Sequence, residues 1–505
     1  MVANAITRRR VLRFGAIAGL GTAAAAALAG CGEAQIVEKE VIKVVTQEVP
    51  VEKVVTQIVE KEKVVEKTVE KIVTQVVEKE KVVEKIVTVV PTVAKRADIK
   101  LVLQTWWNPT ASDSQKRWYD HYTTTYKELA PWVTLDPRFV PWGDMIKKYL
   151  ASIAAGDSPD VFHSSIAFAR DLWDMGTLSD ITEYIKTDPH VGQDQFMESS
   201  IPYRSLEGRW WALPWESLDG RSLAFNIAHF EEAGLDPSWE TVTNWTWDDL
   251  REASLKLTKR EGDKVTRSGF LVITPHEEYF CGWLYSDDAK FYGEGENSVA
   301  FNENDAAKNI LEWHLRALNE DKVSIPIVAE RPDINLFYQD AVSIMQLGTY
   351  RIRVTRDETP IKFEVTGMPK GPNGHKMRTV AFTNLDAIPT KAKLKDDAWE
   401  FIRWRASLVE QVAKLHLMDL PSSRLDFYDT PDWASAIAKV NEIRNIKWIL
   451  EDGGAWPFKR YSEINAEFKP TIEGIMIGEI NVDEGLAELE TKLNAILSKP
   501  VEKVV

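Results

Sequence analysis

Residues 51–67 and residues 69–85 carry nearly the same sequence, because 15 of their 17 aligned positions are identical. The repeat period of eighteen residues equals five turns of an α-helix, so equivalent residues return to the same helix face. Val and Ile recur in steps of three and four along one face, and Glu and Lys fill the other. This pattern is typical of an amphipathic helix with coiled-coil tendencies. We therefore expect a long, helical stalk here and a globular fold only in the rest of the chain.

The segment around the repeat has the composition of a spacer. Residues 35–90 hold eleven Glu and ten Lys but no aromatic residue and no arginine, so they offer no side chain that stacks on a base or reads a groove. Pro50 is expected to break or kink the start of the helix, and valine is a mediocre helix former. We interpret residues 31–97 as this stalk. Its exposed valines leave self-association open.

The first thirty residues are predicted to form an export signal. An arginine-rich start is followed by an apolar run over residues 14–30, slightly short for a membrane span. Residues 7–13 (TRRRVLR) resemble a twin-arginine export motif, and residues 28–31 (LAGC) resemble a bacterial lipobox. We expect the mature chain to begin at Cys31 and to be held by lipid on the outer face of the cytoplasmic membrane.

Cysteine, histidine and charge exclude several classes of protein. The only two cysteines, Cys31 and Cys281, cannot build a disulfide framework or a cysteine-rich zinc site, and Cys281 is expected to be structural or merely tolerated. The eight histidines show no HxH or HxxxH spacing, so we expect no metal and no cofactor. The formal net charge is −15; residues 1–34 carry +3 and residues 35–90 carry −1, which leaves −17 for the rest. Such an acidic surface repels phosphate polymers, so no nucleic acid is expected.

Beyond Pro91 the composition changes to that of a globular domain, and all 19 tryptophans lie beyond position 100. Apolar runs and helix-stop residues such as Gly156 alternate in a strand–helix order. The expected elements are a strand at Ile99–Thr105, a helix from about Ser112 to Ala130, a strand at Val133–Val140, a helix at Asp144–Ala155 and a strand beginning at Pro159. This order predicts an α/β fold with mainly parallel pairing.

The globular part also contains a series of phrases that carry a family resemblance. In chain order they are IAAGDSPDVFHSS, GTLSDITEYI, GRWWALPWESLDGRSLAFNIAHFEEAGLDP, NWTWDDL, FYQDAVSIMQLGTYR, FEVTGMPKGPNG and DDAWEFIRWRAS. Together with the lipobox, this series resembles extracellular solute-binding protein family 1, the sugar-type receptors of ABC importers. The resemblance spans about residues 98–497, and the stalk is not part of the family's core pattern.

The resemblance implies a two-lobed periplasmic-binding-protein-like fold of type II, with the ligand in the cleft between the lobes. Strands should cross between the lobes near Trp215–Asp219, Phe382–Asn384 and Phe427–Trp433. On this basis the chain is divided into an export signal at 1–30, the stalk at 31–97, lobe one at 98–216 and 384–430, lobe two at 217–383 and 431–497, and a tail at 498–505.

A sugar site needs flat aromatic surfaces for C–H faces and carboxylate or amide groups for hydroxyls. Residues at strand ends and predicted crossings meet this need, and so do four residues expected on loops, Trp142, Trp283, Asn384 and Trp456. The resemblance adds an acid at Asp219 and a stacking aromatic at Tyr350. The predicted ligand-binding residues are Trp106, Trp107, Asn108, Trp142, Ser164, Ser165, Trp215, Asp219, Trp283, Thr349, Tyr350, Asn384 and Trp456. In contrast, Trp118, Trp313, Trp399 and Trp404 lie in helical runs and are expected to pack in the core.

The sequence thus predicts a lipid-anchored, extracytoplasmic receptor that binds a carbohydrate and presents it to the membrane subunits of an ABC permease, without catalysis. One alternative is a surface glycoside hydrolase, because Glu216 and Asp219 could serve as paired acids. A stalked adhesin without a small-molecule cleft is another. Among receptors, peptide, polyamine and glycerol-phosphate ligands remain open, although the net negative charge disfavours anionic ones.

Overall fold

The computed structural model describes residues 96–272, 277–325, 334–451, 453–456 and 458–504. The chain divides into two units, residues 1–97 and residues 98–505. The export signal, Cys31 and the repeat lie outside the described residues, so their predicted structures stay predictions. The fold below is that of the second unit.

The first part of this unit follows the predicted strand and helix order closely. Ser112 caps a helix with its hydroxyl, and Gly156 adopts the left-handed conformation, with φ 72°, just past the end of another helix. The elements up to the long sixth strand are β1 (Ile99–Thr105), α2 (Asp113–Leu129), β2 (Val133–Phe139), η1 (Trp142–Asp144), α3 (Met145–Ala154), β3 (Val161–Ser164), α4 (Ile166–Asp174), α5 (Thr182–Thr187), η2 (Gln193–Gln195), η3 (Glu198–Tyr203), β4 (Ser205–Leu206), β5 (Arg209–Trp210) and β6 (Ala212–Asn226).

The remainder of the chain adds a second group of strands and most of the helices. These elements are α6 (Ile227–Glu232), α7 (Trp239–Val242), α8 (Trp247–Leu257), β7 (Lys259–Glu261), β8 (Lys264–Phe270), α9 (Glu277–Ser286), η4 (Glu294–Glu296), η5 (Glu303–Asp305), α10 (Ala306–Asn319), α11 (Ile334–Tyr338), β9 (Val342–Gly348), η6 (Thr349–Arg351), α12 (Ile352–Glu358), β10 (Phe363–Thr366), β11 (Val380–Ala387), α13 (Lys395–Arg405), α14 (Leu408–Met418), η7 (Asp426–Asp429), α15 (Pro431–Ile437), η8 (Asn441–Ile443), α16 (Ile446–Glu451), β12 (Gly454–Ala455), α17 (Tyr461–Met476) and α18 (Val482–Leu497).

Ten strands form one sheet with the path β2-β1-β3-β11-β6-β9-β8-β7, while β10 pairs with β6 and β12 with β11. β1 pairs in parallel with β2 and β3, as predicted. The centre differs, because β11 is antiparallel to β3 and β6, and β6 is antiparallel to β9 and β10. The expectation of mainly parallel pairing is therefore wrong for the central strands. The two ends of the sheet are therefore joined through antiparallel strand pairs at its centre.

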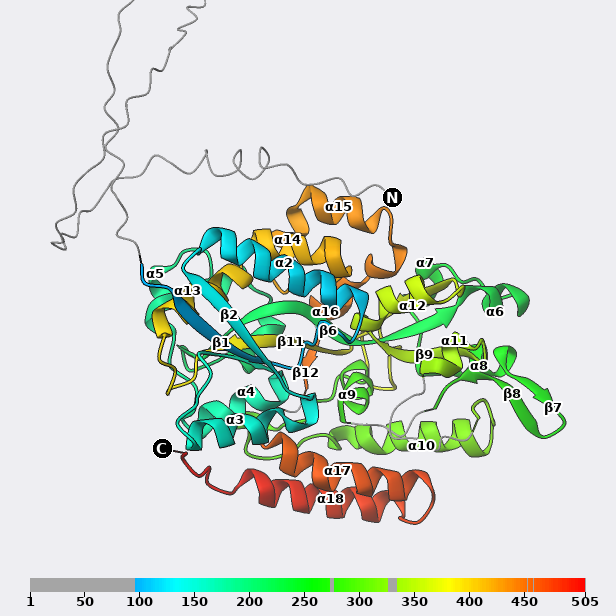
Figure 1. Ribbon diagram of the computed structural model, residues 1–505. Helices are drawn as coiled ribbons and strands as arrows, with labels where there is room; N and C mark the ends of the chain where they lie inside the picture. Colours follow the sequence, from blue (N-terminus) through cyan, green and yellow to red (C-terminus); the bar gives the residue numbers. More distant parts are fainter. Residues whose placement is uncertain (1–95, 273–276, 326–333, 452, 457, 505) are drawn as a thin grey trace, which may run out of the picture. The chain divides into compact units, whose positions relative to one another are not determined.

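The 15-residue strand β6 links the two ends of the sheet. Its first part pairs with β11 and its last part with β9 and β10 (Figure 1). Below, the β1 side means β1 to β3 with α2 to α5, α13 and α14, and the β9 side means β7 to β10 with α6 to α12. The first two predicted crossings fall on β6 and β11. The third is not a strand, because residues 427–433 belong to η7 and α15, and the short strand β12 pairs with β11 instead.

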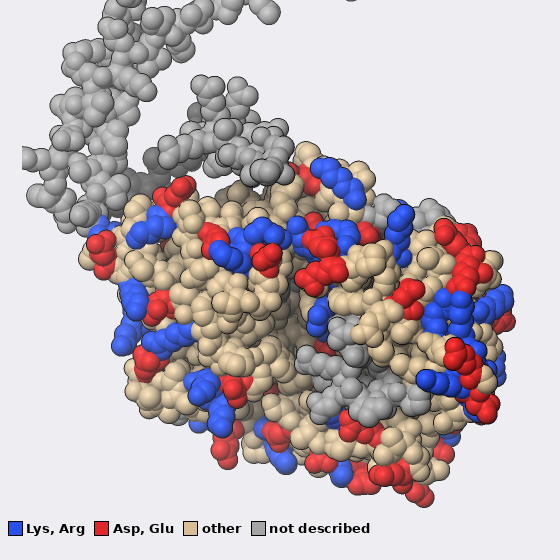
Figure 2. Space-filling view, turned by 45° about the vertical axis from the view of Figure 1, so that its right-hand side comes forward, with Lys and Arg blue, Asp and Glu red and all other residues tan. Residues whose placement is uncertain are grey.

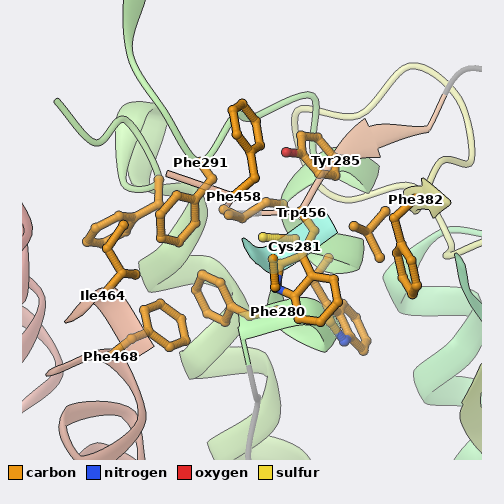
Figure 3. Close-up of a cluster of buried hydrophobic side chains, with 14 of the residues drawn as sticks. Phe280, Cys281, Tyr285, Phe291, Phe382, Trp456, Phe458, Ile464 and Phe468 are labelled. Atoms are coloured by element: carbon orange, nitrogen blue, oxygen red, sulfur yellow. The ribbon is translucent and has the colours of Figure 1, made fainter. Parts of the chain in front are cut away.

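Helices cover both faces of the sheet, with α2 and α14 on one face and α3, α4, α17 and α18 on the other (Figure 1). Trp118, Trp313 and Trp399 are buried, and Trp404 packs partly buried against the same cluster as Trp118. The prediction that these tryptophans pack in the core is confirmed. Cys281 lies among the rings of one core cluster (Figure 3). It is a buried free thiol whose pKa is raised by that burial.

Candidate functional site

A cavity of about 550 Å³ lies where β6 and β11 meet the two sides of the sheet. Its lining comes from the ends of β1 and β3, from α2, from both central strands, and from α9, η6 and α12. The space-filling view shows a hollow in the middle of one face (Figure 2). A larger depression of about 910 Å³ lies between α8, α10 and residues 370–374. We favour the first cavity as the site, because α/β sheets bind ligands at strand ends where the topology switches.

Aromatic rings make up much of the cavity wall. They come from the β1 side, the central strands and the β9 side, so a ligand can contact all three. The aromatic lining residues are Trp106, Trp107, Trp142, Tyr279, Tyr350, Phe382, Trp456 and Tyr461. Such surfaces suit the C–H faces of a sugar. The geometry therefore provides the flat walls that the sequence predicted.

Two of these rings follow β1 and rest on a buried layer. The Trp106 ring lies edge-on to His163 at 4.0 Å between ring centroids, and Trp107 lies edge-on to Trp215 at 5.5 Å. His163 and Trp215 also contact each other at 4.3 Å. Both are fully buried. This second layer holds the two cavity rings against movement, so the wall is formed before a ligand arrives.

An ion pair supports that buried layer. The Arg405 guanidinium lies 3.9 Å from the centroid of Trp215 and 3.0 Å from a carboxylate oxygen of Asp386. Burial raises the pKa of Asp386 to about 6, although Arg405 and Lys414 oppose the shift. Burial is the main cause that holds the pKa of His163 well below its ordinary value, and the charges of Arg405 and Lys414 lower this pKa further. His163 is therefore neutral at physiological pH and acts as an uncharged spacer between rings.

Charged and aromatic residues alternate on the opposite wall. Arg221 on β6 forms an ion pair with Glu278 on α9, and both line the cavity. The Arg221 guanidinium carbon lies 5.1 Å from the ring centroids of Tyr279 and Phe382 and 5.8 Å from that of Tyr350. Three rings thus surround a guanidinium whose charge is balanced by a carboxylate. The pair can offer both donors and acceptors to ligand hydroxyls.

Seven of the predicted residues do line this cavity, and they come from segments far apart in the sequence. They are Trp106, Trp107, Trp142, Ser165, Tyr350, Asn384 and Trp456. Asn384 lies within β11 rather than on a loop. Asp219 pairs through its backbone with Phe382 on β11, and its side chain is outside what the structure describes. Its predicted contact with a ligand stays a prediction.

Five predicted residues do not line the cavity, because their side chains are used elsewhere. The Asn108 side chain accepts hydrogen bonds from the Thr110 N–H and hydroxyl in a turn. Ser164 is buried, and its hydroxyl donates to the Ser165 carbonyl at 2.9 Å. The Thr349 hydroxyl accepts from the Gly220 N–H at 3.3 Å.

The remaining two residues are tryptophans that lie buried behind the cavity wall instead of in it. Trp215 lies behind Trp107, as described above. Trp283 lies on α9, whose residues are all buried, and its ring N–H donates to Gln346 at 3.1 Å. The prediction of Trp283 as a loop residue facing the ligand is wrong for this reason.

The charged part of the wall, formed by Arg221, Glu278 and Arg351, was not predicted from the sequence. Arg221 lies two residues after Asp219 on one strand, so the period of two could have indicated it. Arg351 directly follows the predicted Tyr350. No local signal identified Glu278. Its role depends on the ion pair with Arg221, which lies on β6, 57 residues earlier in the sequence.

Within the described ranges, no group of three or more metal-ligating side chains could hold an ion. No helix among those residues is long and apolar enough to cross a membrane.

Comparison with known proteins places this geometry in a family. Residues 108–409 match the family of bacterial extracellular solute-binding proteins. Binding proteins of Brucella abortus (strain 2308) and Brucella suis biovar 1 (strain 1330) are each 23% identical to the chain over 396 residues. The match covers 76% of this chain and 90% of each relative.

Solved structures with a similar fold include three receptors. The GacH receptor of Streptomyces glaucescens has a TM-score of 0.66 at 16% identity, covering 79% of this chain and 98% of that chain. The cyclic alpha-maltosyl-1,6-maltose binding protein of Arthrobacter globiformis has a TM-score of 0.67 at 18% identity, covering 80% and 100%. The sugar-binding protein MalE of Xanthomonas citri has a TM-score of 0.66 at 16% identity, covering 79% and 98%.

These likenesses confirm the predicted type II periplasmic-binding-protein fold. The family and the similar structures are binding proteins rather than enzymes. The family is extracellular, which implies a location outside the cytoplasm. The family match covers more than half of the 505 residues, and the chain therefore belongs to the bacterial extracellular solute-binding proteins.

Proposed function

We propose that this protein is the lipid-anchored substrate receptor of an ABC importer and that it captures a mono- or oligosaccharide in the cavity between the β1 and β9 sides. The observation that carries the proposal is the cavity wall, which combines eight aromatic rings with the Arg221–Glu278 pair. Rings bind sugar faces, and the charged pair binds hydroxyls. Two of the similar receptors are named for binding acarbose and a cyclic maltosyl-maltose, which supports the same ligand class.

Binding in this cavity favours a closed arrangement of the two sides. A ligand that stacks on Trp107 from the β1 side and on Tyr350 from the β9 side makes both contacts only when the sides approach. That difference in affinity shifts the population toward the closed form. Hinge motion is confined to a few residues of β6 and β11, where the register of the pair shifts between Thr383 and Leu385. The permease subunits then recognise closure.

The membrane attachment is proposed from the sequence, through lipid on Cys31, with residues 31–97 as the stalk. The repeat carries no aromatic ring and no arginine of the kind that lines the cavity. It therefore serves reach rather than recognition. The predicted lobe boundaries, with lobe one at 98–216 and 384–430, follow the first two crossings and are kept here as a proposal.

Isothermal titration calorimetry of the detergent-solubilised full-length protein against a panel of neutral and acidic saccharides tests this function. We expect a Kd in the micromolar range or below for at least one saccharide, with a radius of gyration that falls on binding in small-angle scattering. Sustained release of reducing ends would instead identify a hydrolase. Selective binding of a peptide or a polyamine, with no saccharide bound, would overturn the carbohydrate class.

A further inference from the structure

Arg351 differs from the other cations of the cavity wall. It ends η6 directly after Tyr350, lines the cavity and is half-buried. Its guanidinium carbon lies 5.3 Å from the centroid of the Tyr350 ring. Among the residues that the structure describes, no Asp or Glu lies within ion-pair distance of it. Among the described residues, no ion pair therefore balances the positive charge of Arg351.

The neighbouring arginines are balanced. Arg221 is paired with Glu278. Arg353 lies 3.1 Å from Asp357 and 3.4 Å from Asp419, and Arg356 contacts the same two carboxylates. Two arginines and two carboxylates on and beside α12 thus form a neutral network. This contrast leaves Arg351 as the cation of the wall that is available to an anionic ligand.

Besides Glu278, the acid in the described part of the cavity lining is Glu358, and it is too far away to balance Arg351. It lies seven residues further along α12, which corresponds to about 10 Å at ~1.5 Å per residue. Its side chain is exposed to solvent, so its field at Arg351 is screened over a distance close to the Debye length of about 8–10 Å. Among the described residues, no carboxylate therefore lies close enough to balance Arg351, although the globular unit as a whole is strongly acidic.

On the basis of the proposed function, we propose that the saccharide bound here carries a carboxylate, as in a uronic acid, and that Arg351 binds that carboxylate. A guanidinium presents two parallel N–H donors that match a carboxylate. One unbalanced cation matches one carboxylate charge, whereas a phosphate dianion would leave a negative charge in the cavity. Both guanidinium groups lie near the Tyr350 ring, Arg221 at 5.8 Å and Arg351 at 5.3 Å from its centroid.

This arrangement assigns a part of the ligand to each group. A pyranose ring stacked on Tyr350 extends its substituents toward both arginines. Arg221, already neutralised by Glu278, reads hydroxyl groups. Arg351 binds the carboxylate. The pair of arginines thus determines the orientation of an acidic sugar in the cavity.

Calorimetry of the full-length protein with trisaccharides of galacturonate, glucuronate and mannuronate, each compared with its methyl ester, tests the assignment. Esterification removes the charge and leaves the sugar in place. We expect at least one uronate to bind ten-fold or more tightly than its ester. Arg351→Gln should remove this preference and leave ester binding within about three-fold, and Arg351→Lys should restore part of it.

Arg356→Gln is the matched control, because it removes one arginine charge from the adjoining helix α12 at a position outside the cavity lining. It should retain the preference for the uronate. Equal binding of every uronate and its ester, or an equal loss of both in Arg351→Gln, overturns the assignment. Tight binding of neutral saccharides alone, or of a sugar phosphate above any uronate, overturns the carboxylate and leaves the carbohydrate receptor intact. Binding of no saccharide at all overturns both proposals.

Discussion

Replacing Tyr350 with Ala tests whether the cavity holds its ligand by stacking. Tyr350 is 41% exposed, so part of the residue is accessible to a ligand. Stacking on an aromatic side chain contributes about 1–3 kcal/mol, by analogy with bases. Loss of this ring should therefore raise the Kd for the bound saccharide about 5- to 150-fold. Calorimetry on wild type and variant measures the change.

The same substitution should cost the fold little. The ring is exposed, and its contacts in the protein are with the Arg221 and Arg351 guanidinium groups. Cation–π contacts at exposed sites contribute about 0.5–1 kcal/mol each, so the free energy of unfolding should fall by about 1–2 kcal/mol. Tyr350→Phe keeps the ring face and should bind within a few-fold of wild type. An unchanged Kd for Tyr350→Ala, or a variant that no longer folds, would refute the stacking role.

Three further predictions concern the anchor, the stalk and pH. Cys31→Ala should release soluble or unprocessed protein from membranes; processed protein that still fractionates with membranes would contradict the anchor. Deletion of residues 36–90 should leave the Kd within a few-fold in calorimetry, and a large loss would assign the repeat a role in binding. Burial raises the pKa of Asp171 to about 7, against hydrogen bonds from the Arg460 and Tyr461 N–H groups. A carboxyl group whose pKa rises on folding keeps its proton to a higher pH in the native state than in the unfolded state. Its contribution to the free energy of unfolding therefore falls as the pH rises from about 4 to 7. Asp171→Asn should make the free energy of unfolding change less steeply with pH over this range. An unchanged slope would refute the prediction.

The local elements could be predicted because each is encoded within a few residues. Apolar periodicity and caps place α2 between Ser112 and Ala130, with the N-cap hydroxyl bonded to the Gln115 N–H. The strand at Ile99–Thr105 has the predicted bounds. Such signals do not specify whether two paired strands run parallel or antiparallel to each other. β11 follows β3 by more than 200 residues and pairs antiparallel with it, and no local pattern distinguishes that from parallel pairing.

The tryptophan predictions failed where burial depends on distant chain. Trp215 is buried because His163 packs against its ring and Arg405 from α13 lies over it. Trp107 lies in front of it and faces the cavity. Trp107 comes just after a strand, and Trp215 lies within one. Residue type and local periodicity do not distinguish which of the two rings is covered. The layer to which each belongs is a property of the packed fold.

The charged wall of the cavity could not be predicted for a related reason, and its origin says how the site works. Arg221 comes from β6, Glu278 from a helix of the β9 side, and Phe382 from β11, and the register of β6 with β11 brings the strand residues together. These two strands also link both sides of the sheet. A ligand held on them lies beside the hinge, so a small rotation there moves Trp107 and Tyr350 toward its two faces. Arg221 and Phe382 of the cavity wall thus lie on the two strands that we propose as the hinge, and a substitution of either residue should change affinity and closure together.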